Sequence, residues 1–226
     1  FQKRKHSQDR RIRTIMEQEA FDRIHEMWAP MGYPFHQLVP TLATALGSSA
    51  DRPAALAELV GILQRNGLRY PSIRIDSLHF AVDTPYEAHL SRRVEGPRRV
   101  LSPALAGVVR DAAINVVENG TAIRAKGAIP APDGTPLVIG GKTGTGDNRN
   151  HVVKDDGTKD PIAISRTSTL LSFARDRFFG EDVAYVDGPE ADAYQFTSSL
   201  PTAILKIIGP SLTPLLHDGE VPPTLA

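Results

Sequence analysis

The segment Lys142-Thr143-Gly144-Thr145 is the strongest candidate for chemistry in this 226-residue sequence. The apolar run at residues 137–139 directly before it predicts that the segment lies on a β-strand. Side chains alternate between the two faces of a strand, so Thr143 and Thr145 share one face, where two hydroxyl groups can hold a carboxylate. A strand edge also offers backbone N–H groups to an extended peptide, and such a group can stabilise the oxyanion of an acyl transfer.

Two other interpretations of this segment compete with a binding strand. A phosphate-binding loop needs a glycine five residues before Gly141, where Pro136 stands, and it needs a helix afterwards, whereas residues 146–148 are predicted to be a loop. A glycine-rich turn with an ordinary surface lysine is the simplest alternative for the four residues taken alone. The sequence around the segment is needed to distinguish between these interpretations.

Hydrophobic periodicity and turn residues predict the elements that position the segment. Three helices are predicted. The first spans residues 12–28, the second runs from a cap at Ser49 or Asp51 to Asn66-Gly67, and the third spans residues 103–119 after a cap at Ser102-Pro103. Strands are predicted at residues 72–76, 78–80, 137–146, 167–173 and 182–186, loops at 82–100 and 151–160, and a short apolar segment at 203–208. This order predicts an α+β fold (an α/β sandwich) in which an antiparallel sheet carries helices packed on it.

Composition excludes several classes of function. The formal net charge is zero, so no nucleic-acid partner is expected. The chain has no cysteine, which excludes disulfides, thiolate metal sites and cysteine nucleophiles. Its histidines are scattered without metal-ligand spacing, so neither a metal nor another cofactor is expected. No apolar run approaches the roughly 20 residues that a membrane-spanning helix needs.

Several passages around the Lys-Thr-Gly segment resemble the transpeptidase domain of bifunctional, class A-like penicillin-binding proteins. The matching passages are residues 43–49, 52–58, 66–67, 116–122, 142–145 and 166–169, with Phe173, Phe179-Gly180 and Tyr185-Val186. They span about residues 35–190 and follow the order of the family. The resemblance implies the C-terminal portion of a serine β-lactamase/penicillin-binding-protein-like fold, which is therefore incomplete here. It divides the chain into a helical linker or insertion (1–33), the transpeptidase portion (34–209) and a Pro-rich tail (210–226).

The resemblance also implies the roles of the site residues. Lys142, Thr143 and Thr145 would bind the terminal carboxylate of a D-alanyl-D-alanine stem peptide of peptidoglycan or of a β-lactam. The backbone N–H of Thr145 would form half of the oxyanion hole, which makes Thr145 the catalytic candidate. Gly144 would keep the strand clear of the catalytic helix. No cofactor is implied, and the expected location is the periplasmic face of the inner membrane.

The chain departs from the family in its nucleophile. A serine nucleophile needs a nearby base, which the family supplies in Ser-x-x-Lys. None of the lysines here follows a serine at that spacing, and the second motif, Ser-x-Asn, is absent as well. Ser48 and Ser49 have no lysine or histidine at helical spacing and are interpreted as helix-capping residues. We therefore expect a fragment that is inert alone, with the serine and any membrane anchor encoded upstream.

Three functions follow from this interpretation. The first is a peptidoglycan cross-linking D,D-transpeptidase domain, with a glycosyltransferase region further upstream in a bifunctional parent. The second is a D,D-carboxypeptidase or β-lactamase-type hydrolase, in which water resolves the acyl-enzyme. The third is a non-catalytic domain that binds stem peptide or serves as a scaffold. The first is preferred because the passages at residues 116–122 and the long N-terminal helix favour it.

Overall fold

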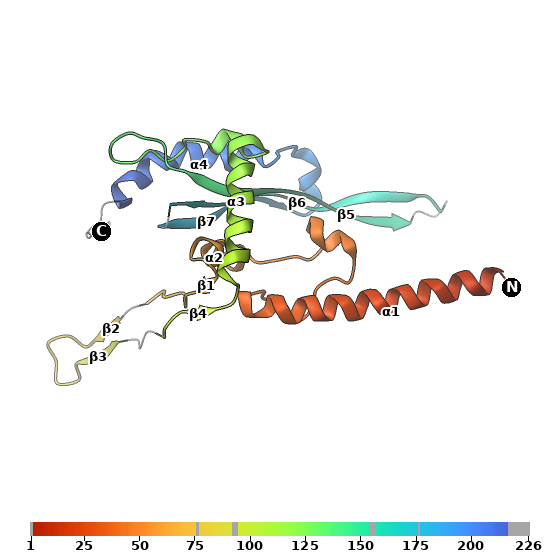
Figure 1. Cartoon of the computed structure of the whole chain (residues 1–226), viewed down its shortest axis with the longest axis horizontal. Coiled ribbons are helices and arrows are strands. Elements are labelled where there is room, and N and C mark those ends of the chain that lie inside the picture. Colours follow the sequence, from red (N-terminus) through yellow and green to blue (C-terminus); the bar gives the residue numbers. More distant parts are fainter. Residues whose placement is uncertain (1, 76, 92–94, 154–156, 176, 217–226) are drawn as a thin grey trace.

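A three-stranded antiparallel sheet organises the chain (Figure 1). The structure is a computed structural model that describes residues 2–75, 77–91, 95–153, 157–175 and 177–216. Its strands are β5 (Ile139–Val153), β6 (Lys159–Ala174) and β7 (Phe178–Asp187), in the order β5-β6-β7. Within the described residues, β5 and β7 therefore each leave one edge without a neighbouring strand.

Helices cover both faces of this sheet, as Figure 1 shows for α2 (Pro53–Gln64) and α4 (Ser199–Leu212). α2 packs on the face that carries Phe179, whose ring lies 2.8 Å from the position that a Cβ on Gly61 would take. α4 packs on the other face, where Leu205 joins the main apolar core with Leu170 of β6. Strand alternation places these two sets of side chains on opposite faces, so helices pack against both faces of the central part of the sheet.

The helix α3 (Pro103–Asn119) packs against β5 and leads into the core. Ser102 caps it, since its hydroxyl accepts a hydrogen bond from Leu105 N–H, as the sequence predicts. After α3 the chain passes through the short 3₁₀ helix Ile123–Ala125 and a turn at Gly134 before it enters β5. Val117 and residues of this connection are buried beside Leu205 and Leu170.

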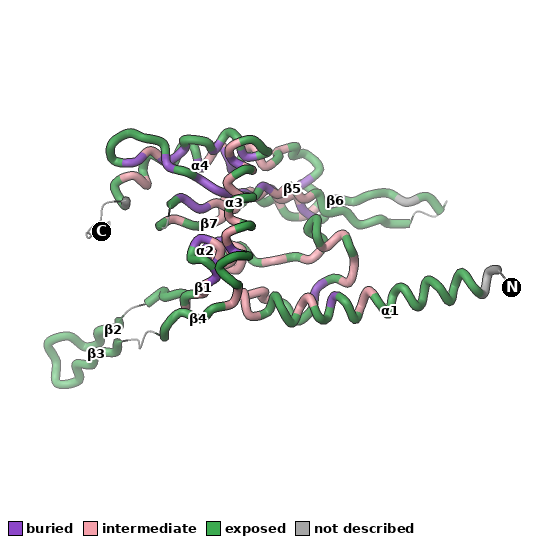
Figure 2. The backbone as a smooth tube through the Cα atoms, in the orientation of Figure 1, coloured by how far each residue is buried: buried purple, intermediate pink, exposed green. Residues whose placement is uncertain are grey.

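The remaining elements lie outside the main sheet. They are α1 (Gln2–Trp28), the pair β1 (Leu68–Arg69) with β4 (Arg98–Arg99), the hairpin β2 (Ser77–Phe80) with β3 (Ala88–Ser91), and 3₁₀ helices at Ala29–Met31, Leu42–Leu46, Pro189–Ala193 and Thr213–Leu216. α1 and the β2–β3 hairpin both project from the body, and Figure 2 shows most of their length as exposed. Among the described residues, no helix combines the length and apolar character that crossing a membrane requires.

The α+β class with an antiparallel sheet is confirmed, and several boundaries differ from the prediction. Residues 146–148, 151–153 and 159–160, all predicted to be loop, are strand, because β5 and β6 continue as a two-stranded arm. Residues 147–153 are all exposed, so no alternation of buried and exposed side chains marks this part of β5 as a strand in the sequence. Residues 72–75 are not a strand, and the predicted loop at 82–100 contains β3 and β4; Asp76 lies outside the described residues.

The cap of α2 also differs. Arg52 precedes the helix and makes no side-chain cap hydrogen bond. Ser49 instead accepts a hydrogen bond from Val39 N–H at 2.9 Å, and Asp51 accepts one from Arg52 N–H. At the other end of the chain, α4 and the 3₁₀ helix Thr213–Leu216 extend into the predicted tail, of which residues 217–226 lie outside the described residues. The three-part division of the chain stays a prediction.

Glu181 on β7 makes the stability of this fold depend on pH. Burial and the nearby carboxylates of Asp51 and Asp182 raise its pKa from 4.5 to about 7, and its Oε2 is buried without a hydrogen bond. An unfolded chain loses this proton near pH 4.5 while the folded chain keeps it, so the free energy of unfolding falls as the pH rises through 4.5 to 7. Since the side chain is only partly buried, water screens its charge, and we expect Glu181→Gln to stabilise the chain by only about 1–2 kcal/mol at pH 8.

Urea unfolding at pH 4 and pH 8 measures this effect. Glu181→Gln is expected to match the unmodified chain at pH 4, where both side chains are neutral, and to gain stability only at pH 8. Glu190→Gln, at an exposed carboxylate in the 3₁₀ helix Pro189–Ala193, is the matched control and should leave both values unchanged. An equal gain for Glu181→Gln at both pH values would show that ionisation is not the cause.

Candidate active site

The segment Lys142–Thr145 lies on β5, as predicted, at the edge of the sheet. In the β5–β6 register Thr143 is opposite Leu170 and Thr145 is opposite Ser168. Directly opposed residues project from the same face of a sheet, and Leu170 belongs to the core beneath α4. The two threonine side chains therefore share the α4 face, which confirms the prediction that they lie on one face.

Both threonine hydroxyls have hydrogen-bond partners, and these contacts still allow O–H groups to donate to a ligand. The Oγ1 atoms of Thr143 and Thr121, the latter just after α3, are 2.6 Å apart. Thr145 Oγ1 accepts a hydrogen bond from Ser198 N–H at 3.1 Å, directly before α4. A hydroxyl that accepts keeps its own O–H as a donor, and a hydroxyl pair keeps one O–H between them. This arrangement can offer two donors to a carboxylate.

Lys142 and Gly144 occupy the opposite face of β5. The Lys142 side chain is exposed, and its Nζ donates a hydrogen bond to the Thr143 carbonyl. A Cβ on Gly144 would lie 2.8 Å from Thr169 Oγ1 on the neighbouring strand, so the absence of a side chain here allows the hydroxyl of β6 to approach. The ammonium of Lys142 can therefore reach a ligand by giving up one backbone hydrogen bond.

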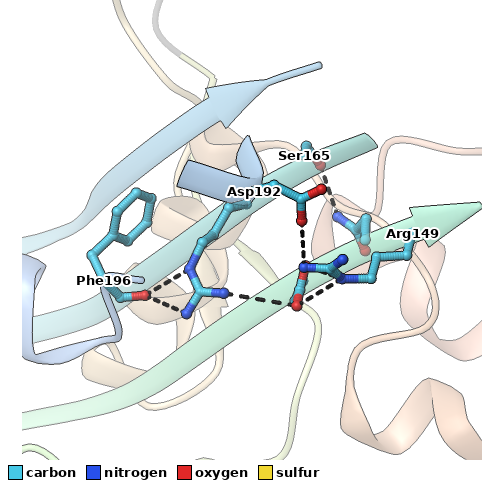
Figure 3. Close-up of polar contacts among 7 residues, drawn as sticks. Arg149, Ser165, Asp192 and Phe196 are labelled. Carbon is cyan, nitrogen blue, oxygen red and sulfur yellow. Dashed lines mark hydrogen bonds and ion pairs between the residues drawn. The ribbon is translucent and has the colours of Figure 1, made fainter. Parts of the chain in front are cut away.

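A polar cluster holds the chain that leads to Ser198 against the sheet (Figure 3). Arg166 of β6 donates from Nε and Nη2 to the Phe196 carbonyl at 3.0 and 2.8 Å. Its Nη1 also lies 3.8 Å from a carboxylate oxygen of Asp147 on β5. Phe196 is two residues before Ser198, so Arg166 fixes the backbone whose N–H contacts Thr145.

Arg149 extends this cluster along β5. It donates from Nε to Asp147, and its Nη2 lies 2.7 Å from Asp192 Oδ1 in the 3₁₀ helix Pro189–Ala193 (Figure 3). The hydrogen bond with Asp147 is the main reason that the pKa of Arg149 is raised above its ordinary value. The cluster joins β5, β6 and the segment before α4, so it braces the threonine face.

Sequence reasoning identifies the strand but not its supports. Thr121 belongs to one of the resembling passages and Arg166 begins another, while Ser198 is not among the predicted site residues. The Thr-Ser-Ser run before an apolar segment at residues 197–199 is a helix N-terminus signal that could have indicated it.

Other features of the described residues lie apart from this site. No group of three or more His, Cys, Asp or Glu side chains among them could hold a metal ion. A mostly apolar cavity lies between α1, α2 and α3, lined by residues such as Trp28, Leu59 and Val109, and it contains none of the four predicted site residues.

No protein-family model and no curated protein matches the sequence. Solved structures are similar in fold. Penicillin-binding protein 3 from Mycobacterium tuberculosis, in its apo form, gives a TM-score of 0.57 at 19% identity over 89% of this chain and 48% of that chain. Its complex with ampicillin gives 0.56 at 18% identity over 89% and 47%. The ceftriaxone acyl-enzyme complex of penicillin-binding protein A from the same organism gives 0.52 at 20% identity over 82% and 42%.

These similarities confirm the predicted fold: the chain has an incomplete penicillin-binding-protein fold. It spans less than half the length of the three solved chains.

Proposed function

We propose that this chain forms one side of the active site of a peptidoglycan D,D-transpeptidase. The observation that carries the proposal is the edge strand β5, on which Lys142 and two hydrogen-bonded threonine hydroxyls follow one another. Lys142 lies on the other face of β5 from the two threonines, and its flexible side chain can reach around the open edge to a carboxylate that the two hydroxyls also bind. Both D-alanyl-D-alanine peptides and β-lactams carry a carboxylate. The sequence resemblance and the fold support the same assignment.

In this proposal each residue of β5 has a separate role. Lys142 and the O–H groups of Thr143 and Thr145 bind the ligand carboxylate. The open edge of β5 holds the peptide in extended form, and the backbone N–H of Thr145 donates to the oxyanion. Thr121 and Ser198 orient the two hydroxyls, and Gly144 keeps the strand compact.

The acyl transfer itself uses a serine from outside these 226 residues. The serine oxygen attacks the carbonyl of the penultimate D-alanine, and a base takes the serine proton. The base then passes this proton to the nitrogen of the breaking amide bond, so that the terminal D-alanine leaves with a free amino group. The amine of a second stem peptide then attacks the ester, which forms the cross-link and returns the proton to the serine. Hydrolysis by water in this second step would make the same site a carboxypeptidase or β-lactamase. We place the complete protein at the periplasmic face of the inner membrane.

Covalent labelling with a fluorescent penicillin, read by intact mass, tests this function. We expect no adduct on the 226-residue chain, because it lacks Ser-x-x-Lys, and one adduct on the complete gene product. Absence of an adduct on both would overturn the transpeptidase proposal and favour the non-catalytic binding domain. An adduct on the 226-residue chain would instead show that it carries its own nucleophile.

A further inference from the structure

The helix α1 presents a long face that the body of the protein does not cover. Of its 27 residues, those near the C-terminal end hold it to the body: Phe21 is only 8% exposed, and His25 Nε2 lies 2.9 Å from the Phe35 carbonyl oxygen. The N-terminal half projects away from the sheet (Figure 1), and Figure 2 shows it as exposed. An isolated helix of this kind is marginally stable in water, so a contact along its free face would stabilise it.

Large apolar side chains lie on this free face. Ile12 is 51% exposed, Ile15 is 52% exposed and Met16 is 64% exposed. Ile12 precedes the buried Phe21 by nine residues, about two and a half helical turns, so the two side chains project in opposite directions. Ala20, also exposed, continues the apolar stripe one turn after Met16. The stripe is therefore directed away from the body, where another molecule can lie against it.

Charges along α1 are segregated. Residues 3–13 contain six Lys or Arg and one acidic residue, Asp9, whereas residues 17–26 contain four acidic residues and one basic residue, Arg23. Asp9 and Arg23 each lie seven residues from Met16, so all three lie on one stripe of the helix. In the part of the chain that the structure describes, neither Asp9 nor Arg23 forms an ion pair or a side-chain hydrogen bond.

We propose that α1 pairs antiparallel with α1 of a second copy of this chain, about a two-fold axis near Met16. This axis places the basic half of each helix against the acidic half of the other. It also places Asp9, the one acidic residue of the basic half, beside Arg23 of the second copy, the one Lys or Arg of the acidic half. These two side chains carry opposite charges and attract each other. Met16 then packs on Met16 of the second copy, and Ile12 packs near Ala20. A parallel pair would set the basic halves against each other, which the charges oppose.

The interaction is independent of the proposed enzymatic site, because α1 lies apart from β5. Sedimentation equilibrium of the 226-residue chain tests it. The average mass should rise with protein concentration from the 24.5 kDa of one chain toward twice that value, and the rise should weaken at high salt. Met16→Glu should raise the dissociation constant by about tenfold or more. Thr14→Glu adds the same charge on the other side of the helix and should leave the dissociation constant unchanged.

Charge exchange tests the direction of pairing. Asp9→Arg and Arg23→Asp should each weaken association, and the double variant should restore it, because the guanidinium introduced at position 9 again meets a carboxylate of the second copy. In a parallel pair, residue 9 faces residue 9, so the double variant would give no such restoration. Far-ultraviolet circular dichroism of each variant checks that the helix content is unchanged.

Disulfide trapping gives a second measure of direction, since the chain has no cysteine of its own. A mixture of Asp9→Cys and Arg23→Cys chains should cross-link to each other on oxidation, while Asp9→Cys alone should not. Cross-linking of Asp9→Cys alone would overturn the antiparallel arrangement. A constant mass of one chain at all concentrations would overturn the self-association itself.

Discussion

Replacing Lys142 with alanine in the complete gene product is expected to slow acylation by a β-lactam by about 10²–10³-fold, within the range for removal of one partner of a hydrogen-bonded charge pair. In the proposed site, Lys142 supplies the positive charge that meets the ligand carboxylate, to which the Thr143 and Thr145 hydroxyls donate hydrogen bonds. Without it the ligand carboxylate is desolvated at the strand without a compensating cation. Rapid-quench labelling with a fluorescent penicillin, read as the second-order rate constant, measures the effect.

Two controls separate binding from folding in this experiment. Lys126→Ala removes a lysine that is exposed and paired with Glu118 away from β5, and it should leave the acylation rate unchanged. Lys142 itself is exposed, so its replacement should change the free energy of unfolding by less than about 0.5 kcal/mol. An acylation rate for Lys142→Ala within a factor of about two of the rate of the unmodified protein would show that Lys142 does not bind the ligand. The proposed carboxylate site on β5 would then lose its cation.

The sequence predicts the centre of this site better than its surroundings. The strand at Lys142–Thr145 and the shared face of Thr143 and Thr145 follow from local chain geometry, because alternation along a strand needs no knowledge of the rest of the fold. The contact between Thr145 and Ser198 joins residues that are 53 positions apart. No periodicity predicts such a contact, since it depends on how α4 crosses the sheet.

The same distinction explains the errors in the predicted elements. The helix at 103–119 is predicted well because its cap, its proline and its apolar stripe are all local signals. The extension of β5 to Val153 is missed because its hydrogen bonds come from β6, while its own side chains are exposed and mostly polar, so no buried apolar face marks it. The hairpin of β2 and β3 is missed in part for a related reason: all eight of its strand residues are exposed, so no apolar face marks the second strand.

The packing of α4 on the core predicts a large effect on stability when Gly209 is replaced. A Cβ at this position would overlap the Ala128 carbonyl oxygen and lie 2.7 Å from the carbonyl carbon, and both residues are buried. We expect Gly209→Ala to destabilise the chain by about 2–4 kcal/mol, although alanine is the better helix former, because α4 must move away from the backbone that it covers. That is a large part of the roughly 5–15 kcal/mol by which domains are stable.

Gly107 provides the matched comparison because it is also a helical glycine, in α3, but apart from its own helix backbone and chain neighbours no atom of the described residues lies within 4 Å of a Cβ built on it. Gly107→Ala should therefore stabilise the chain by about 0.5–1 kcal/mol through the lower entropy of the unfolded chain. Urea unfolding of the two variants at constant m-value compares them directly. Opposite signs are expected because the alanine at position 209 meets the Ala128 carbonyl and also precedes Pro210, whose ring disfavours a helical residue with a Cβ before it, whereas Gly107 meets neither. A gain in stability for both variants would contradict the packing of α4 on the core at Ala128. It would also contradict the position of the segment before α4, which brings Ser198 N–H to Thr145.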